Sequence, residues 1–286
     1  MKKIKVMSVF GTRPEAIKMC PLVLELQKYE EIESIVCVTA QHREMLDQVL
    51  ELFNITPDYD LDIMKTRQSL AGITTRVLEG MEDVLKKEHP DIVLVHGDTS
   101  TSFVAALAAF YEQIPVGHVE AGLRTYDIYS PFPEEMNRQL TGRIAKMHFS
   151  PTVRNYENLI KENINSDDIY ITGNTVIDAL KTTVKDDYVF ENECLKNIDF
   201  ENKRVIVVTA HRRENLGKPL EDICTAIGEI VDEYPDTEVV YPVHLNPAVR
   251  EVAWRILGDN KRVHLVDPLD VMELHNAIAR SFMVMT

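Results

Sequence analysis

Ionisable side chains follow three short apolar runs of this chain, each at the point where a predicted strand ends. The segments are His96-Gly97-Asp98-Thr99, His118-Val119-Glu120-Ala121-Gly122 and Thr209-Ala210-His211-Arg212-Arg213-Glu214. Two strand-end carboxylates that face a His–Arg cluster across a cleft between domains would suit acid–base chemistry on an anionic substrate. A further candidate, His244, sits just past a later strand.

Two of these segments have a structural alternative. Asp98 can be the N-cap of a helix that begins at Thr99, and the His211 cluster can be a solvated turn. Glu120 follows an apolar strand and precedes no obvious helix start, so no structural need for its carboxylate is apparent. The sequence therefore favours a functional role for Glu120 in particular.

The first predicted strand runs into the turn Gly11-Thr12-Arg13-Pro14-Glu15, which feeds a helix. Free backbone N–H groups and the helix dipole favour an anion at such an N-terminus, and Arg13 and Lys18 add positive charge. The turn is neither G-x-G-x-x-G nor G-x-x-x-x-G-K-[ST], which disfavours NAD binding and P-loop ATP binding. A glycine at this turn can also serve backbone geometry alone.

Two adjacent carboxylates follow a proline-stiffened loop in Ser130-Pro131-Phe132-Pro133-Glu134-Glu135. A helix is predicted over Met136–Ala145. Either Glu134 or Glu135 can be functional, or can simply favour the start of that helix through its dipole.

These residues are positioned by short apolar, β-branched runs that alternate with helical patterns. The predicted strands are Ile4–Phe10, Ser34–Thr39, Ile92–His96, Val116–Val119, Met147–Ser150, Ile169–Thr172, Arg204–Thr209, Glu238–Tyr241, Val263–Val266 and Phe282–Thr286. Predicted helices include Glu15–Tyr29, with Pro14 at the first helical position, and Thr99–Tyr111. Buried strands joined by helical crossovers predict a parallel, doubly wound α/β sheet.

The alternation stops over the charged stretch Thr183–Lys203, which we interpret as a linker, and then resumes. We therefore expect two domains, residues 1–172 and residues 173–286. The last predicted strand, Phe282–Thr286, is not followed by the loop and helix that would cover it. The second domain is accordingly expected to be incomplete at the C-terminus, with low stability and weak activity.

Composition narrows the class of protein. Of 286 residues 45% are hydrophobic, and 31 basic against 46 acidic side chains give a formal net charge of −15, which argues against nucleic acid as a partner. The four cysteines show neither a disulfide framework nor zinc-ligand spacing, so no metal is expected. No signal peptide or membrane span is apparent, which predicts a cytoplasmic protein with no membrane partner.

Seven motifs of this chain together resemble the bacterial non-hydrolysing UDP-N-acetylglucosamine 2-epimerases. They are Gly11-Thr12-Arg13-Pro14-Glu15-Ala16-Ile17-Lys18, Thr39-Ala40-Gln41-His42-Arg43, His96-Gly97-Asp98, His118-Val119-Glu120-Ala121-Gly122-Leu123-Arg124-Thr125, Pro133-Glu134-Glu135, Thr172-Gly173-Asn174-Thr175 and His211-Arg212-Arg213-Glu214. The resemblance covers essentially the whole chain. It implies two Rossmann-like domains, as in the B-type glycosyltransferases, with the active site in the cleft.

The resemblance also implies a reaction: reversible epimerisation of UDP-N-acetylglucosamine (UDP-GlcNAc) to UDP-N-acetylmannosamine (UDP-ManNAc) at C2, which supplies ManNAc for cell-surface polysaccharide. The C2 proton is not α to a carbonyl, so elimination of UDP to 2-acetamidoglucal and re-addition is the expected route. No redox cofactor is needed.

We expect Asp98, Glu120 and Glu134 to act on the sugar and His211 to act on the diphosphate side or in acid–base steps. Arg13, Lys18 and Arg138 are expected to hold the nucleotide.

Family members resembling this chain bind a second UDP-GlcNAc beside the active site. The matching positions are Gln41, Arg67, Gln68, Glu134, Arg212 and His244, and a homodimer is expected.

Three segments of the family that bind the nucleotide have no match here: an Asp-Ser-Gly-Gly loop, a Glu-Glu pair and a Thr-Glu-Arg-Pro-Glu segment. An inactive binding fragment is therefore one alternative, and a UDP-sugar glycosyltransferase, which shares the fold but catalyses a different reaction, is another.

Overall fold

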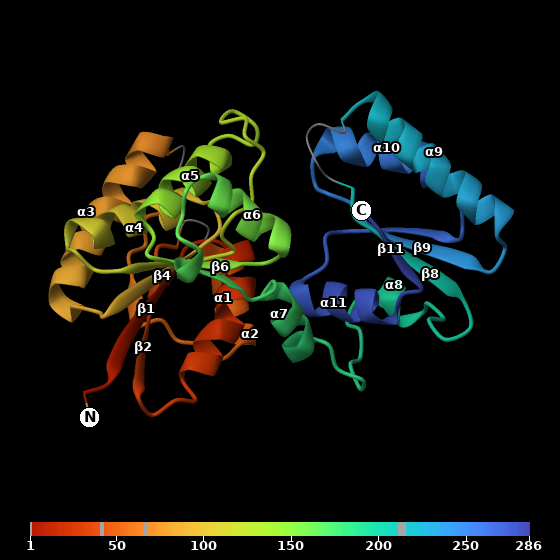
Figure 1. The fold of residues 1–286 in the computed structure, drawn as a ribbon. Helices are drawn as coiled ribbons and strands as arrows, with labels where there is room; N and C mark the ends of the chain where they lie inside the picture. The colour runs from red at the N-terminus through yellow and green to blue at the C-terminus, as the bar shows by residue number, and fades with distance from the viewer. Residues whose placement is uncertain (1, 41–42, 66–67, 211–215) are drawn as a thin grey trace. The chain divides into compact units, whose positions relative to one another are not determined.

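The computed structural model describes residues 2–40, 43–65, 68–210 and 216–286. They form two compact units, Met1–Ala179 and Leu180–Thr286, each built on its own parallel sheet (Figure 1). The predicted fold class, two Rossmann-like α/β units, is confirmed. Among these residues no helix is long and apolar enough to cross a lipid bilayer.

The first unit is a seven-stranded parallel sheet with the strand order β3-β2-β1-β4-β5-β6-β7. Its strands are β1 (Ile4–Phe10), β2 (Ile32–Val38), β3 (Tyr59–Asp60), β4 (Ile92–His96), β5 (Val116–Val119), β6 (Met147–Ser150) and β7 (Ile169–Ile171). Its helices are α1 (Arg13–Leu26), α2 (Arg43–Leu52), α3 (Leu70–Glu88), α4 (Ser100–Tyr111), α5 (Glu134–Ile144) and α6 (Val153–Lys161), and α7 (Val176–Thr183) spans the division between the units. The two-residue strand β3 was not predicted, because so short a segment has no periodicity to recognise.

Helices α3, α4 and α5 pack beside one another on one face of this sheet, and α1 and α2 lie on the other (Figure 1). Apolar side chains of β1 and β4, such as Val9 and Val95, form a buried core with α3 and α4 residues such as Val77 and Val104. Strands buried on both faces explain the continuous apolar runs in the sequence.

The chain reverses its direction of winding between β1 and β4. From β1 it adds β2 and β3 on one side, and from β4 it adds β5, β6 and β7 on the other. The crossover helices therefore diverge at this point, which leaves a crevice outside the carboxyl ends of the two strands, where doubly wound folds bind ligands. Two of the predicted motifs, the Gly11 turn and the Asp98 turn, follow these two strands.

The second unit has a four-stranded parallel sheet of order β10-β9-β8-β11. Its strands are β8 (Arg204–Val208), β9 (Thr237–Pro242), β10 (Val263–Val266) and β11 (Met283–Met285), and its helices are α8 (Glu193–Lys196), α9 (Lys218–Glu233), α10 (Pro247–Leu257) and α11 (Val271–Arg280). Helices α9 and α10 pack side by side on one face, and α8 and α11 lie on the other (Figure 1).

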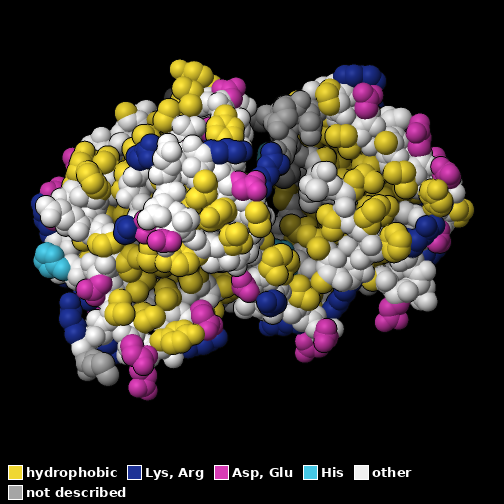
Figure 2. All heavy atoms as spheres, viewed as in Figure 1, with side chains coloured by type: hydrophobic (Ala, Val, Ile, Leu, Met, Phe, Trp, Pro, Cys, Tyr) yellow, Lys and Arg dark blue, Asp and Glu magenta, His cyan; other side chains and the backbone are white. Residues whose placement is uncertain are grey.

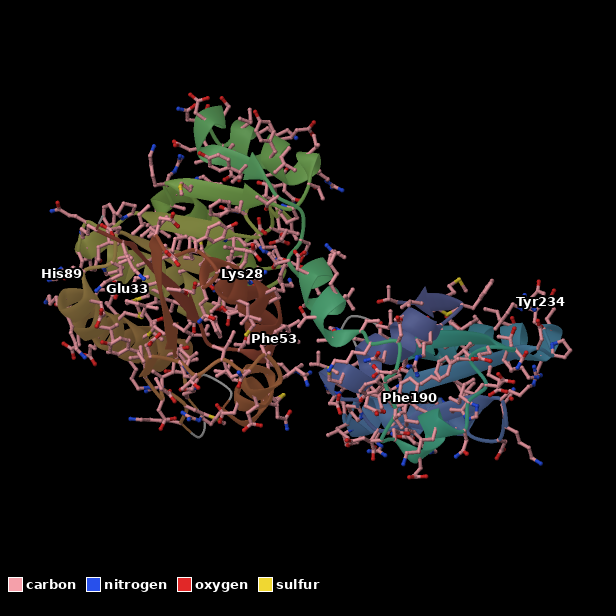
Figure 3. All side chains as sticks on the ribbon, turned by 90° about the horizontal axis from the view of Figure 1, so that it is seen from below. Lys28, Glu33, Phe53, His89, Phe190 and Tyr234 are labelled. Carbon is pink, nitrogen blue, oxygen red and sulfur yellow. The ribbon has the colours of Figure 1, made fainter. Side chains whose placement is uncertain are left out.

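The charged stretch 183–203 was interpreted as a linker, but part of it packs into the second unit. Its apolar residues Phe190, Leu195 and Ile198 are buried in a core with Val205 and Val207 of β8, and Phe190 lies in the interior of the second unit (Figure 3). Their burial was not predicted, because sparse apolar residues in a charged segment show no regular period.

Acidic and basic side chains are interspersed over the face seen in Figure 2. Within the described residues visible there, no broad basic area appears. This distribution agrees with the acidic net charge and gives no electrostatic footprint for a phosphate backbone on that face.

Candidate active site

The turn after β1 is built around Gly11. A Cβ atom there would lie 2.0 Å from Thr39 Oγ1 and 2.8 Å from Thr101 Oγ1. Only glycine therefore allows the turn between β1 and α1 to pack so closely against these two threonines. Thr12 precedes the helix, and Arg13 and Pro14 occupy its first turn. The helix thus starts two residues before the predicted Glu15, and its N-terminus faces the carboxyl edge of the sheet, where its dipole favours an anion.

Glu15 joins this turn to the turn after β4. Its Oε2 accepts hydrogen bonds from the backbone N–H groups of Gly11 and Thr12 at 3.0 and 2.9 Å, and its Oε1 accepts from the Thr99 hydroxyl at 2.7 Å. The Ser102 hydroxyl lies 2.9 Å from the same Oε1. Burial raises the pKa of the Glu15 carboxyl, and the hydrogen bonds oppose that effect. Glu15 therefore fixes the anion-favouring turn next to Asp98.

Glu120 follows β5 with a left-handed backbone, φ +63°, which is uncommon for a residue other than glycine and often marks a functional position. Its Oε1 accepts hydrogen bonds from Lys18 Nζ and, at 2.9 Å, from Asn174 Nδ2. The His96 Nε2 lies 3.7 Å from its Oε2. Burial, followed by the charge of Lys18, lowers the pKa of His96 to about 3, so this imidazole is neutral beside the carboxylate.

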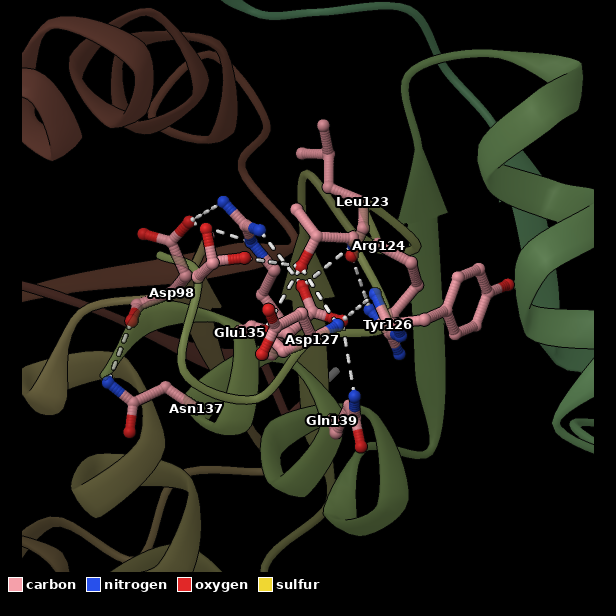
Figure 4. Close-up of polar contacts among 12 residues, drawn as sticks. Asp98, Leu123, Arg124, Tyr126, Asp127, Glu135, Asn137 and Gln139 are labelled. Atoms are coloured by element: carbon pink, nitrogen blue, oxygen red, sulfur yellow. Dashed lines mark hydrogen bonds and ion pairs between the residues drawn. The ribbon is translucent and has the colours of Figure 1, made fainter. Parts of the chain in front are cut away.

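Asp98 follows β4 and binds Arg138 of α5. Arg138 Nε and Nη2 lie 2.8 and 2.6 Å from Asp98 Oδ2, and Nη1 lies 3.1 Å from Glu135 Oε2. Asn137 Nδ2 donates to the Asp98 carbonyl at 2.9 Å (Figure 4). The alternative of Asp98 as a helix cap is wrong, because Thr99 is the N-cap of α4 and its hydroxyl accepts from the Ser102 N–H.

The structure thus brings together two pairs of the predicted site residues, Glu120 with Lys18 and Asp98 with Arg138. Lys18 and Arg138 are already paired with carboxylates. Arg13 and Glu134 are half-buried, and neither side chain forms a hydrogen bond or ion pair with another described residue. The helix predicted over Met136–Ala145 begins at Glu134, so Glu134 and Glu135 both lie in its first turn. Both carboxylates can therefore interact favourably with the helix dipole, which was the structural alternative for them.

The remaining predicted residues are scattered. The Gln68 side chain accepts a hydrogen bond from Arg76 Nη2. In the second unit, the exposed His244 accepts from the Asn246 N–H at 3.0 Å through its Nδ1. His211, Gln41, Arg67 and Arg212 lie outside the described residues.

Three residues of the site, Glu15, His96 and Asn174, were named in the motifs without a role, and Glu135 was named only as an alternative to Glu134. The motifs therefore contained these residues but did not reveal what they contact. Their roles depend on contacts between distant segments, such as Asn174 with Glu120, and a linear pattern does not encode these.

Three buried histidines, His96, His118 and His148, should make the first unit sensitive to acid. Burial lowers their pKa values to about 3, about 3 and about 4. The unfolded chain binds protons below its ordinary histidine pKa of about 6.5, so stability falls as the pH drops from there through the folded values. The upper bound is about 2 kcal/mol per histidine between pH 6.5 and pH 5.

Urea unfolding at pH 7 and pH 5 measures this effect. His148→Leu should lose up to one third of the pH dependence of the free energy of unfolding. An identical pH dependence in His148→Leu and the parent chain would contradict the assignment.

Comparison with known proteins identifies relatives over the whole fold. A sequence model described as UDP-N-acetylglucosamine 2-epimerase matches residues 24–286. The chain is 60% identical to the UDP-N-acetylglucosamine 2-epimerase of Bacillus subtilis (strain 168) over 286 residues, which covers all of this chain and 74% of that protein. It is 53% identical to the Escherichia coli (strain K12) enzyme of the same name, covering 99% of this chain and 77% of that one.

A solved structure shows the same likeness in three dimensions. The crystal structure of UDP-GlcNAc 2-epimerase from Neisseria meningitidis, bound to UDP-GlcNAc, is 50% identical in sequence and matches with a TM-score of 0.87. The match covers 98% of this chain and 76% of that one.

Proposed function

The chain belongs to the UDP-N-acetylglucosamine 2-epimerase family, and we propose that it interconverts UDP-GlcNAc and UDP-ManNAc by inverting C2 of the sugar. Members of this family are isomerases, and the resemblance carried by the motifs is confirmed. The ManNAc unit so formed would feed the synthesis of cell-surface polysaccharide.

The chemistry of the substrate dictates the route. C2 bears an amide nitrogen and is not adjacent to a carbonyl, so a carbanion there has little resonance stabilisation. A base instead removes the C2 proton while the bond from C1 to the UDP oxygen breaks, and UDP leaves with the electron pair as the C1–C2 double bond of 2-acetamidoglucal forms. Addition of UDP back to C1, with a proton delivered to the other face of C2, completes the inversion.

The observation that carries the proposal is the position of Asp98 and Glu120. They follow the adjacent strands β4 and β5. Glu120 Oε2 lies close to the turn that holds Asp98: a Cβ atom on Gly97 in that turn would be 3.4 Å from this oxygen. Two carboxylates at one edge, beside a helix N-terminus, supply proton transfer and support positive charge at C1 next to an anion-binding position. Glu134, at the start of α5, is proposed as the third carboxylate.

Arg13 is the proposed contact for the diphosphate. It stands in the first turn of α1 without a partner in the described part of the chain, while Lys18 and Arg138 are shared with carboxylates. An unpaired guanidinium at a helix N-terminus is well placed for phosphate oxygens. Lys18 and Arg138 would mainly orient Glu120 and Asp98 and could turn toward the nucleotide as UDP leaves.

The resemblance also supports three finer proposals. A second UDP-GlcNAc would bind through the positions named above, of which Gln68, Glu134 and His244 are described, and would regulate the enzyme. His211 would assist on the diphosphate side. The enzyme would act as a homodimer.

Reaction in D₂O tests the elimination route. The proton delivered to the other face of C2 comes from an acid that has exchanged with solvent, so UDP-ManNAc should carry about one deuterium at C2. Mass spectrometry and proton NMR of the product measure this. Unlabelled UDP-ManNAc would contradict exchange through a solvent-accessible base, and UDP release that requires an added sugar acceptor would favour glycosyl transfer instead.

A further inference from the structure

Glu135 has no exposed side-chain surface, although it is charged and lies in the first turn of α5. Its Oε2 accepts from the Thr125 backbone N–H and Arg138 Nη1, and its Oε1 from the Tyr126 backbone N–H and Gln139 Nε2, all at 3.1 Å. The contacts converge on one carboxylate (Figure 4). All four partners are donors, so this position suits a group that only accepts hydrogen bonds.

The environment keeps Glu135 ionised. Burial acts to raise the pKa of its carboxyl, but the hydrogen bonds from Thr125, Gln139, Tyr126 and Arg138 together hold that pKa below its ordinary value. A buried anion is costly unless it is paired. The Glu135 carboxylate is paired with one cation, the guanidinium of Arg138.

Arg138 connects this buried anion to Asp98. Its Nη1 is held by Glu135, and its Nε and Nη2 face Asp98 at 2.8 and 2.6 Å. The donors of a guanidinium form a rigid planar fork, so fixing Nη1 also fixes the edge presented to Asp98. The positive charge of Arg138 is consequently divided between two carboxylates.

Two other cations of the first unit are engaged with different carboxylates. From α1, Lys18 pairs with Glu120, and from the loop after β5, Arg124 pairs with Glu162 through Nε at 2.7 Å. Within the described ranges, Arg138 is the cation in contact with both Asp98 and Glu135.

We propose that Glu135 is a positioning residue for the epimerisation: it holds Arg138 Nη1 and so orients the guanidinium edge that faces Asp98, which keeps the Asp98 carboxylate in the position from which it acts on the sugar. This inference rests on the function proposed above. It gives the two neighbouring carboxylates different tasks, because Glu134 has no described partner and Glu135 has four.

The first test measures Asp98 without requiring activity. In the full chain at pH 7, ¹³C NMR records the resonance of the labelled Asp98 carboxyl, which Asp98→Asn assigns. Glu135→Gln replaces the carboxylate that holds Arg138 Nη1, so the guanidinium should turn relative to Asp98 and the Asp98 carboxyl resonance should move. An unchanged resonance in folded Glu135→Gln would overturn the proposal.

Glu273→Gln is the matched control. Glu273 is also buried, at 3% exposure, in the first turn of α11, and accepts from the backbone N–H groups of Glu191 and Asn192 at 2.6 and 3.4 Å. The control should lose stability without moving the Asp98 resonance. An equal movement of that resonance in Glu273→Gln would show that the effect reflects a general loss of packing and would reject the proposal.

Kinetics give the second readout, in particular if Glu135→Gln does not fold. Glu135→Asp keeps the negative charge, but its shorter side chain places the carboxylate farther from Arg138. We therefore expect kcat to fall about tenfold, with KM for UDP-GlcNAc within about twofold of the parent value. Unchanged kcat in the folded variant would overturn the proposal. A parent chain without epimerase activity would instead reject the proposed function, while the NMR measurement at pH 7 would still decide whether Glu135 positions Arg138 against Asp98.

Discussion

Glu120→Gln is expected to lower epimerase turnover by at least about 10²-fold while leaving the protein folded. The amide oxygen can still accept from Asn174 and Lys18, so the local contacts of the side chain can persist. The charge and the capacity to take up a proton are lost, and removal of a general acid or base costs about 10²- to 10⁴-fold. Initial rates with UDP-GlcNAc, together with circular dichroism of the variant, measure both parts of the expectation.

Glu88→Gln is the control for this variant. Glu88 pairs with Lys5 at 3.0 Å and its side chain is 18% exposed, compared with 13% for Glu120. It lies at the amino end of β1, away from the carboxyl edge, because its partner Lys5 is the second residue of that strand. Turnover in Glu88→Gln should remain within about twofold of the parent. Near-normal turnover in Glu120→Gln would refute its assignment as a catalytic carboxylate.

The sequence was sufficient to predict where Asp98 and Glu120 meet. Both follow apolar runs of the length of a buried strand, and carboxyl ends of neighbouring parallel strands lie at one edge of a sheet. The five strands Ile4–Phe10, Ile92–His96, Val116–Val119, Met147–Ser150 and Val263–Val266 have the predicted bounds. Strong local periodicity thus determined the scaffold and the edge that carries the chemistry.

Properties that depend on helix phase or long-range packing were not predictable. The start of α5 at Glu134 decides that Glu135, and not Glu134, turns into the protein, and a pair of adjacent glutamates does not reveal this. Thr99 rather than Asp98 caps α4, since both residue types are good caps. The contact of Asn174 with Glu120 joins positions 54 residues apart, and no local rule anticipates it.

Gly122→Ala is expected to destabilise the first unit by about 3–5 kcal/mol, the range of severe steric and backbone lesions. Gly122 has φ +90°, and a Cβ there would lie 2.3 Å from the Asn155 carbonyl oxygen and 2.8 Å from its carbon. These are backbone atoms at the start of α6, so they cannot turn aside as a side chain can. The Gly122 carbonyl also accepts from Asn158 Nδ2 at 3.0 Å, and a shift would break that buried hydrogen bond.

Gly173→Ala separates the two causes of this loss. Gly173 has a similar φ of +81°, but a Cβ there would meet no atom within 4 Å. Its alanine variant should therefore lose only the backbone preference, about 1–2 kcal/mol. Urea unfolding followed by circular dichroism gives both differences. Equal losses in the two variants would mean that backbone conformation alone matters at Gly122, and that α6 does not pack against the Glu120 turn closely enough to hold it in place.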